Sequence, residues 1–234
     1  MDFVIIAAGQ GSRIMNECGY EKPIVPIDGV PMVERLVRVL FSVGADRVHI
    51  VTNPAMTKTN VLLKHLRDEE CMAIDFRPIV SDNSFYSLEE AARGVKGRFV
   101  AFTVDTIFKT SDLAMFVRKF ESLPDGEVLM GVTSFVDDES PLWYRLSDDG
   151  GEALECRKGG EAYGGAPVVS AGIYGISDKA MDMACGERYP ESTSDFQDIL
   201  ARSSEVHVRP FFFDNAFDVD HEADIAKANE FIGR

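Results

Sequence analysis

The chain has 234 residues, of which 45% are hydrophobic and 27% are charged, so it is long enough to bury a large core within one domain. It carries 24 Lys and Arg residues against 39 Asp and Glu residues, which gives a formal net charge of −15 at pH 7. Such an acidic surface repels nucleic acid and anionic lipid, so neither is an expected partner. A phosphorylated ligand would need a local basic site.

Apolar runs and cysteines indicate where the protein works. The longest apolar runs, such as Phe3 to Ala8 and Val48 to Thr52, are too short to cross a bilayer, and no basic segment precedes a cleavable apolar one. The four cysteines are scattered and lack the close pairs of a zinc site, and a chain of this length needs no disulfides. We therefore expect a cytoplasmic protein with reduced thiols and no membrane partner.

Strand-like and helix-like segments alternate in the first half of the chain. Asp2 to Ala8 is an apolar run that ends at a glycine loop, which predicts a strand buried on both faces. Apolar residues at helical spacing follow Pro31 and stop near Gly44, which predicts a helix. The alternation continues with strands at 48–52, 73–80 and 98–104 and with helices around 61–66 and 87–93. This order indicates right-handed βαβ units in a mainly parallel sheet with helices on both faces.

The second half of the chain has a looser pattern. It predicts helices at about 111–121, 196–202 and 223–231 and strands at 127–135, 168–176 and 206–212. Turn-rich sequence with paired glycines between positions 134 and 167 predicts hairpins or an acceptor-binding flap. We therefore expect one domain over residues 1–234, an α/β Rossmann-like three-layer sandwich with a mainly parallel mixed sheet.

The glycine loop after the first strand is a candidate phosphate site. Gly9 and Gly11 let the backbone approach an anion closely. A dinucleotide-binding fingerprint would need Gly or Ala where Ile14 stands, and the phosphate loop of ATPases would need a Gly-Lys-Ser/Thr sequence, which is absent. A Gly-x-Gly pair alone also fits a plain turn from strand to helix.

The surrounding sequence makes the loop more specific. Ala7-Ala8-Gly9-Gln10-Gly11-Ser12-Arg13, with Lys22-Pro23 nine residues after the arginine, resembles the signature of the nucleotidyltransferase (NTP transferase) family. That family includes sugar-1-phosphate nucleotidyltransferases, phosphocholine cytidylyltransferases and molybdenum-cofactor guanylyltransferases. Further segments that resemble it are Asn83–Leu88, Val104–Phe108 and Phe217–Asp220.

The resemblance implies a fold like that of the nucleotide-diphospho-sugar transferases and an enzyme that needs Mg²⁺. Such an enzyme transfers a nucleotidyl group from an NTP to a phosphorylated small molecule, with a sugar 1-phosphate as the leading acceptor, and releases pyrophosphate. The acceptor phosphate is already ionised near neutral pH, so the reaction needs no general base. Positioning and neutralisation of charge dominate the catalysis.

Two basic residues receive phosphate roles by this resemblance. Arg13 would hold the β- and γ-phosphates with its planar fork, and Lys22 would contact the α-phosphate or the acceptor phosphate as a point charge. Each has an ordinary alternative as a solvated surface residue. The loop residues that the resemblance assigns to nucleotide binding are Ala7, Ala8, Gly9, Gly11, Ser12 and Arg13.

Acidic residues are candidates for a magnesium site. Asp105 follows a buried strand, where ligands bind in open α/β sheets, and Mg²⁺ prefers one or two carboxylates together with phosphates and water. A second carboxylate should therefore converge on the ion, and Asp220 is preferred over Asp218 for this role. Asp220 has a competing role as the N-cap of the following helix.

Three further residues are candidates for contact with the nucleotide or with the acceptor. Asn83 and Ser87 match family positions near the base and ribose, but Asn83 or Ser84 could instead cap a helix without any ligand. Lys158 in the glycine-rich segment could meet the acceptor phosphate or sugar, although a lysine in such a segment is usually solvated. The expected partners are thus an NTP and a phosphorylated acceptor.

Two other functions fit parts of the pattern. A nucleotide-sugar-dependent glycosyltransferase of related fold would carry an Asp-x-Asp motif soon after the central strand, where Val104–Ile107 lacks it, although Asp218–Asp220 has that spacing. A non-catalytic nucleotide-binding regulatory protein would keep the loop but not the accompanying charged residues. The sequence leaves open the acceptor, the nucleobase and whether the chain forms a homo-oligomer.

Overall fold

The computed structural model describes residues 1–233, and contacts divide the chain into two compact units. Unit 1 comprises Met1–Arg93, Phe102–Ile107 and Asp218–Arg234, and unit 2 comprises Gly94–Ala101 and Phe108–Phe217. Each unit is therefore assembled from segments that lie far apart in the sequence. That residues 1–234 act as one domain stays a prediction.

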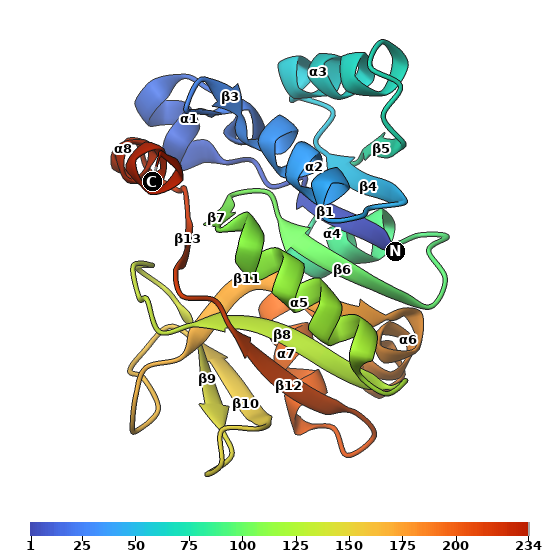
Figure 1. Cartoon of the computed structure of the whole chain (residues 1–234), viewed down its shortest axis with the longest axis vertical. Coiled ribbons are helices and arrows are strands. Elements are labelled where there is room, and N and C mark those ends of the chain that lie inside the picture. The colour runs from blue at the N-terminus through green and yellow to red at the C-terminus, as the bar shows by residue number, and fades with distance from the viewer. Residues whose placement is uncertain (234) are drawn as a thin grey trace. The chain divides into compact units, whose positions relative to one another are not determined.

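Unit 1 is built on parallel strands that match the predicted order. Strand β1 (Asp2–Ala7) pairs in parallel with β4 (Arg47–Thr52), which pairs in parallel with β5 (Ile74–Pro78) (Figure 1). On the other side of β1 lies the end of β6 (Arg98–Thr103), where the Val104 N–H donates to the carbonyl of Ile6 at 3.2 Å. The middle of β1 is fully buried, so the prediction of a strand covered on both faces is confirmed.

Helices and a short turn complete unit 1. They are α1 (Ser12–Cys18), the 3₁₀ turn η1 (Lys22–Ile24), α2 (Met32–Ser42), α3 (Thr57–Asp68), α4 (Ser84–Ala91) and α8 (Glu222–Ile232). A small hairpin of β2 (Pro26–Ile27) and β3 (Val30–Pro31) precedes α2. Pro31 is the N-cap of α2, and buried Val33, Leu36, Val37 and Leu40 recur at helical spacing, as the sequence predicts.

Unit 2 has a mixed sheet. Strand β8 (Glu127–Thr133) pairs antiparallel with β11 (Val169–Ser177) and parallel with β12 (His207–Phe212). Strands β9 (Leu142–Leu146) and β10 (Ala153–Lys158) form an antiparallel hairpin, so the prediction of a hairpin within 134–167 is confirmed. The short strands β7 (Thr106–Phe108) and β13 (Ala216–Asp218) lie where the chain passes between the units.

Aromatic side chains fill the core of unit 2. Its helices are α5 (Thr110–Ser122), α6 (Asp178–Glu187) and α7 (Thr193–Arg202). The rings of Phe116 and Phe211 meet edge to face at 5.4 Å, and Phe213 packs on both of them. A Cβ at Gly175 of β11 would lie 2.8 Å from the ring of Phe120, so this position needs glycine for close packing.

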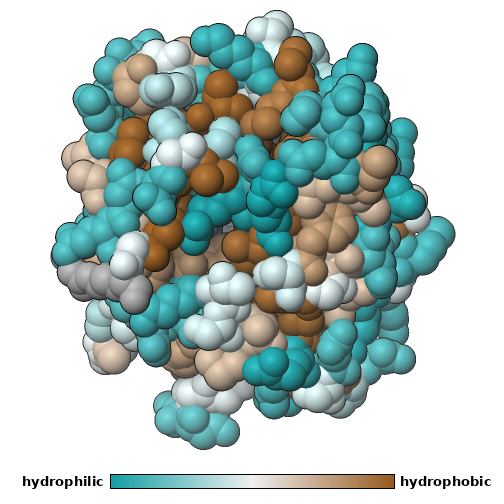
Figure 2. Space-filling model, turned by 45° about the horizontal axis from the view of Figure 1, so that its top comes forward, coloured by the Kyte–Doolittle hydropathy of each residue, from teal (hydrophilic) through white to brown (hydrophobic). Residues whose placement is uncertain are grey.

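The outer surface agrees with the composition. Hydrophilic residues cover most of the face in Figure 2, and apolar residues appear between them. None of the helices within residues 1–233 combines the length and apolar character that a membrane crossing requires. The predicted α/β class with a mixed sheet is confirmed by the strand pairing.

Candidate functional site

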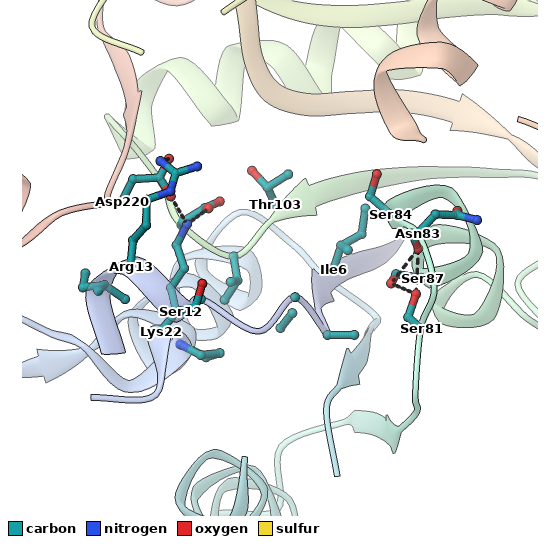
Figure 3. A pocket seen from close by; sticks show the side chains of 18 of the residues that line it. Ile6, Ser12, Arg13, Lys22, Ser81, Asn83, Ser84, Ser87, Thr103 and Asp220 are labelled. Atoms are coloured by element: carbon teal, nitrogen blue, oxygen red, sulfur yellow. Dashed lines mark hydrogen bonds and ion pairs between the residues drawn. The ribbon is translucent and has the colours of Figure 1, made fainter. Parts of the chain in front are cut away.

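A pocket of about 460 Å³ lies in unit 1, where β1, β5 and β6 end (Figure 3). Ligands bind at this edge of open α/β sheets, because loops there carry polar groups that the strands hold in place. Most residues predicted for nucleotide, phosphate and metal binding line this pocket. They are Ala7, Ala8, Gly9, Gly11, Ser12, Arg13, Lys22, Asn83, Ser87, Asp105 and Asp220.

The glycine loop is shaped by a close approach to Lys22. Gly11 has a φ of 57° and is the N-cap of α1, in the left-handed region that favours glycine. A Cβ at Gly11 would lie 2.6 Å from the Cβ of Lys22, whereas a Cβ at Gly9 would meet nothing within 4 Å. The two glycines therefore differ. Only at position 11 do both the backbone conformation and the neighbouring Lys22 require a glycine.

Lys22 joins the two predicted metal ligands. Its Nζ contacts Asp105 Oδ2 and lies 2.5 Å from Asp220 Oδ1, and its side chain is only 13% exposed. Burial acts to lower the pKa of Lys22, but the charges of Asp105 and Asp220 outweigh it and raise the pKa above its usual value. Residues that are 83 and 198 positions away from Lys22 thus converge on one ammonium group.

Arg13 lies at the exposed end of the same cluster. Its guanidinium is 3.5 Å from Asp220 Oδ2, and its side chain is 58% exposed. An exposed pair of this kind holds weakly, so the guanidinium is available to an incoming anion. Burial opposes ionisation of Asp220, but Lys22 and then Arg13 lower its pKa, so its carboxylate is charged.

The carboxylates offer oxygen atoms to a cation. Asp105 Oδ1 is buried without a hydrogen-bond partner, while Oδ2 of the same group faces Lys22. An orphaned buried carboxylate oxygen is costly, and a hard cation would satisfy it. No group of three or more His, Cys, Asp or Glu residues suited to a metal was found in residues 1–233. Two carboxylates fit Mg²⁺, which takes its remaining oxygens from phosphates and water.

Asp220 and Asp218 have different surroundings. The N-cap of α8 is His221, and the carboxylate of Asp224 accepts the N–H groups of Asp220 at 3.0 Å and His221 at 2.9 Å. The side chain of Asp220 is therefore not the helix cap and lines the pocket. Asp218 instead accepts a hydrogen bond from Thr106 Oγ1 at 2.8 Å, and burial, with the charge of Asp105, raises its pKa.

The start of α4 forms another wall of the pocket. The side-chain oxygen of Asn83 accepts the N–H of Tyr86 at 2.8 Å, so Asn83 caps the helix as the alternative interpretation proposed. Ser87 Oγ donates to Ser81 Oγ at 2.7 Å. Asn83 and Ser87 line the pocket all the same. Asn83 thus both caps α4 through its side-chain oxygen and lines the pocket.

Several lining residues are not assigned to the site by the sequence. They are Ile6, Ile14, Pro23, Ser81, Asp82, Ser84, Thr103 and Val104. Thr103 stands two positions before Asp105, and Ser81 and Asp82 follow β5, so the rule that sites form at the carboxyl ends of parallel strands could have found them. Lys158 does not line this pocket and is an exposed residue of β10 in unit 2, so its acceptor role stays a prediction.

Comparisons with known proteins cover most of the chain. The family model described as MobA-like NTP transferase domain matches residues 3–158. The bifunctional protein GlmU of Methanococcus aeolicus is 22% identical over 184 residues, which are 78% of this chain and 42% of that protein. The chain thus spans less than half the length of this relative.

Two solved structures share the fold. The inositol-1-phosphate CTP transferase from T. maritima has a TM-score of 0.78 at 19% identity, covering 99% of this chain and 94% of that one. A putative glucose-1-phosphate thymidylyltransferase from Bacillus anthracis, in complex with a sucrose, has a TM-score of 0.80 at 18% identity, covering 99% and 95%. These likenesses confirm the predicted fold, which resembles that of sugar-phosphate nucleotidyltransferases.

Proposed function

The chain belongs to the MobA-like NTP transferase domain family, and from this premise we propose that it transfers a nucleotidyl group from an NTP to a phosphorylated small molecule. The observation that carries the proposal is the pocket in which Lys22 meets Asp105 and Asp220 beside the glycine loop. The proposed acceptor class is a sugar 1-phosphate. The names of the two structural neighbours include inositol 1-phosphate and glucose 1-phosphate, and this supports the choice.

The reaction follows from the charges in the pocket. An ionised oxygen of the acceptor phosphate attacks the α-phosphorus of the NTP, the bond to the β-phosphate oxygen breaks, and pyrophosphate leaves with its negative charge. Arg13 is proposed to hold the β- and γ-phosphates, and Lys22 to contact the α-phosphate or the acceptor phosphate. The acceptor is a dianion near neutral pH, because its second pKa is about 6, so the pocket needs no base.

Asp105 and Asp220 are the proposed magnesium ligands. The unpartnered Oδ1 of Asp105 is the clearest donor atom, since Oδ2 already faces Lys22. A bound Mg²⁺ would neutralise phosphate charge during transfer. Lys22 holds the two carboxylates close together, so they face the same part of the pocket before any cation arrives.

The proposal is tested by measuring pyrophosphate release. The purified chain is incubated with each common NTP and a panel of sugar phosphates, with Mg²⁺ or with EDTA, and the nucleotide product is identified by mass spectrometry. We expect an NDP-linked product that depends on Mg²⁺. If no NTP gives product with any acceptor, nucleotidyl transfer is wrong, and NTP binding without turnover would favour a regulatory protein.

The glycosyltransferase alternative loses support from the site. It needs both carboxylates of Asp218-Val219-Asp220 at one metal, but the side chain of Asp218 is bonded to Thr106 and does not line the pocket. When a nucleotide sugar is supplied in place of the NTP, a glycosyltransferase would consume it and release free nucleoside diphosphate. The two reactions therefore give different products.

A further inference from the structure

A buried carboxylate stands next to Lys22 in the sequence. Glu21 is only 8% exposed. Its Oε1 accepts the N–H of Lys58 at 3.1 Å, and its Oε2 accepts both the N–H and the hydroxyl of Thr59 at 2.7 Å. These donors belong to the first turn of α3, whose own N-cap, Met56, provides no side-chain hydrogen bond. Glu21 thus caps a helix more than 35 residues away in the sequence.

The surroundings of Glu21 favour its charged form. Burial of a carboxylate is costly unless strong donors replace water, and a helix N-terminus offers unpaired N–H groups and a favourable dipole. Burial acts to raise the pKa of Glu21, but the hydrogen bonds from Thr59 and Lys58 outweigh it and lower the pKa. The carboxylate is therefore an anchor between the lysine turn and α3, and it does not face the pocket.

The same residue begins the turn that carries Lys22. The carbonyl of Glu21 accepts the N–H of Ile24 at 2.9 Å, which closes η1. On the opposite side, Gly11 leaves room for the Cβ of Lys22, which a side chain there would occupy. The backbone of Lys22 is thus held between the glycine loop and the anchored turn. A lysine side chain has several rotatable bonds, so a fixed starting point limits where its ammonium can go.

We propose that Glu21 is a positioning residue, which ties the Lys22 turn to the N-terminus of α3 so that the ammonium reaches Asp105 and Asp220 in the pocket. Its effect on the reaction passes through Lys22, because Glu21 itself lines no part of the pocket. The inference rests on the proposed function for the role of Lys22 in transfer. The position of the ammonium can be measured without any turnover.

The first test measures how accessible Lys22 is to a reagent. Limited reductive methylation, followed by peptide mass spectrometry, is applied to the wild type, Glu21→Gln, Glu34→Gln and Leu66→Ala. Glu34 repeats the change of charge on α2, and Leu66 is a buried residue of α3, so Leu66→Ala disturbs that helix without removing the carboxylate. We expect Lys22 to react about tenfold faster only in Glu21→Gln, the factor expected for losing a charge-assisted hydrogen bond.

Equal reactivity of Lys22 in the wild type and Glu21→Gln would overturn the proposal, as would the same increase in Leu66→Ala. If Glu21→Gln fails to fold, Thr59→Val replaces it, because this change removes a single donor to Glu21 and keeps the carboxylate. The expected increase is then smaller but has the same direction. This experiment stands whether or not the chain turns over an NTP.

The second test is a double-mutant cycle on turnover. Glu21→Gln should lower kcat about tenfold in the wild type and change it less than about twofold in Lys22→Met, because the residues act as one unit. The KM for NTP should change little. An equal fall in both backgrounds would show that Glu21 acts by another route. Absence of turnover in the wild type would contradict the proposed function. The positioning role of Glu21 would then be judged from the reactivity of Lys22 alone.

Discussion

The pocket of unit 1 and the β9–β10 hairpin of unit 2 hold their charged side chains in different ways. In the pocket, Lys22 is largely buried between two carboxylates, and one oxygen of Asp105 has no partner. On the hairpin, Glu155 pairs at 2.9 Å with Arg145 and with Arg202, whose side chains are about half exposed. Exposed pairs contribute about 0–1 kcal/mol each, whereas buried charges are costly unless they are compensated.

The charged side chains of the hairpin keep the surface soluble, whereas the buried charges of the pocket lower the stability of the fold unless they are compensated. The buried Oδ1 of Asp105 has no hydrogen-bond partner, which costs free energy, and a cation bound there would satisfy it. The hairpin charges are already solvated or paired. Variants in the pocket should therefore affect turnover strongly, and variants in the ion pairs of Glu155 on the hairpin should affect it weakly.

The largest expected effect comes from Asp105→Asn. The change removes the charge that faces Lys22 and a proposed metal ligand, so pyrophosphate release should fall about 10³-fold. Asp214→Asn, at an exposed position of unit 2, is the matched control and should keep its rate. Circular dichroism checks that both variants fold. If Asp105→Asn keeps more than about a tenth of the rate, the carboxylate has no such role.

Gly11→Ala should come next, because the new Cβ would collide with the Cβ of Lys22 and α1 would begin from a strained residue. We expect a loss of about 1–3 kcal/mol in the free energy of unfolding, together with reduced turnover. Urea denaturation measures the loss. Gly9→Ala is the control, since its Cβ meets nothing within 4 Å, and equal losses in both variants would contradict this account.

Glu21→Gln should destabilise the fold in a way that depends on pH. The folded pKa of Glu21 is lowered, so its contribution is present above the unfolded value of about 4.3 and is lost as the pH falls through the folded value. We expect a difference of about 1–3 kcal/mol from the wild type at pH 7, shrinking in acid. Urea titrations at several pH values measure it. A difference in the free energy of unfolding that does not change with pH would contradict the lowered pKa of Glu21.

Lys158→Ala tests the predicted acceptor role of the hairpin. If Lys158 meets the acceptor phosphate, its loss should raise the KM for the acceptor about tenfold, the value of one charge-assisted hydrogen bond, and leave the KM for NTP unchanged. Arg145→Ala on the neighbouring strand serves as the control for loss of one positive charge. Steady-state kinetics with varied acceptor concentration compares the KM values of the two variants. An unchanged KM would remove Lys158 from the site.

The smallest effect is expected from Glu155→Gln. The hydrogen bond from Arg145 lowers the pKa of Glu155, but both arginine partners are about half exposed, so solvent screens the pairs. The free energy of unfolding should fall by less than about 1 kcal/mol, and pyrophosphate release should not change. Thermal unfolding and the turnover assay measure both. A large loss of turnover would contradict the claim that the ion pairs of the hairpin, unlike the charges of the pocket, do not contribute to turnover.

Local patterns predict part of this molecule well. The strand before Gly9, the helix after Pro31 and the place of Asp105 at the end of a strand follow from short-range rules on apolar spacing and turns. The sequence predicts that α4 starts at about Ser87, but Asn83 caps the helix, which begins at Ser84. Element ends depend on single capping hydrogen bonds, which composition alone does not reveal.

Other elements depend on contacts that the sequence order hides. The sequence does not predict helix α6, because two of its buried residues, Ala180 and Ala184, are small and leave Met181 as the large apolar side chain among them, while Ser177 caps the helix through the N–H of Ala180. The role of Glu21 depends on donors in α3, and no pattern around position 21 indicates them. The different surroundings of Asp218 and Asp220 likewise depend on a distant residue, because Thr106, which follows another strand, donates a hydrogen bond to Asp218.

The contact between Gly11 and Lys22 also limits which sequences can evolve from this one. A larger residue at position 11 would need a smaller one at position 22, but a smaller residue there gives up the ammonium that faces Asp105 and Asp220. A second change at position 22 could thus relieve the collision but not restore the charge. In a saturation screen for activity, the two positions should tolerate almost no substitutions, and revertants of Gly11→Ala should return to glycine.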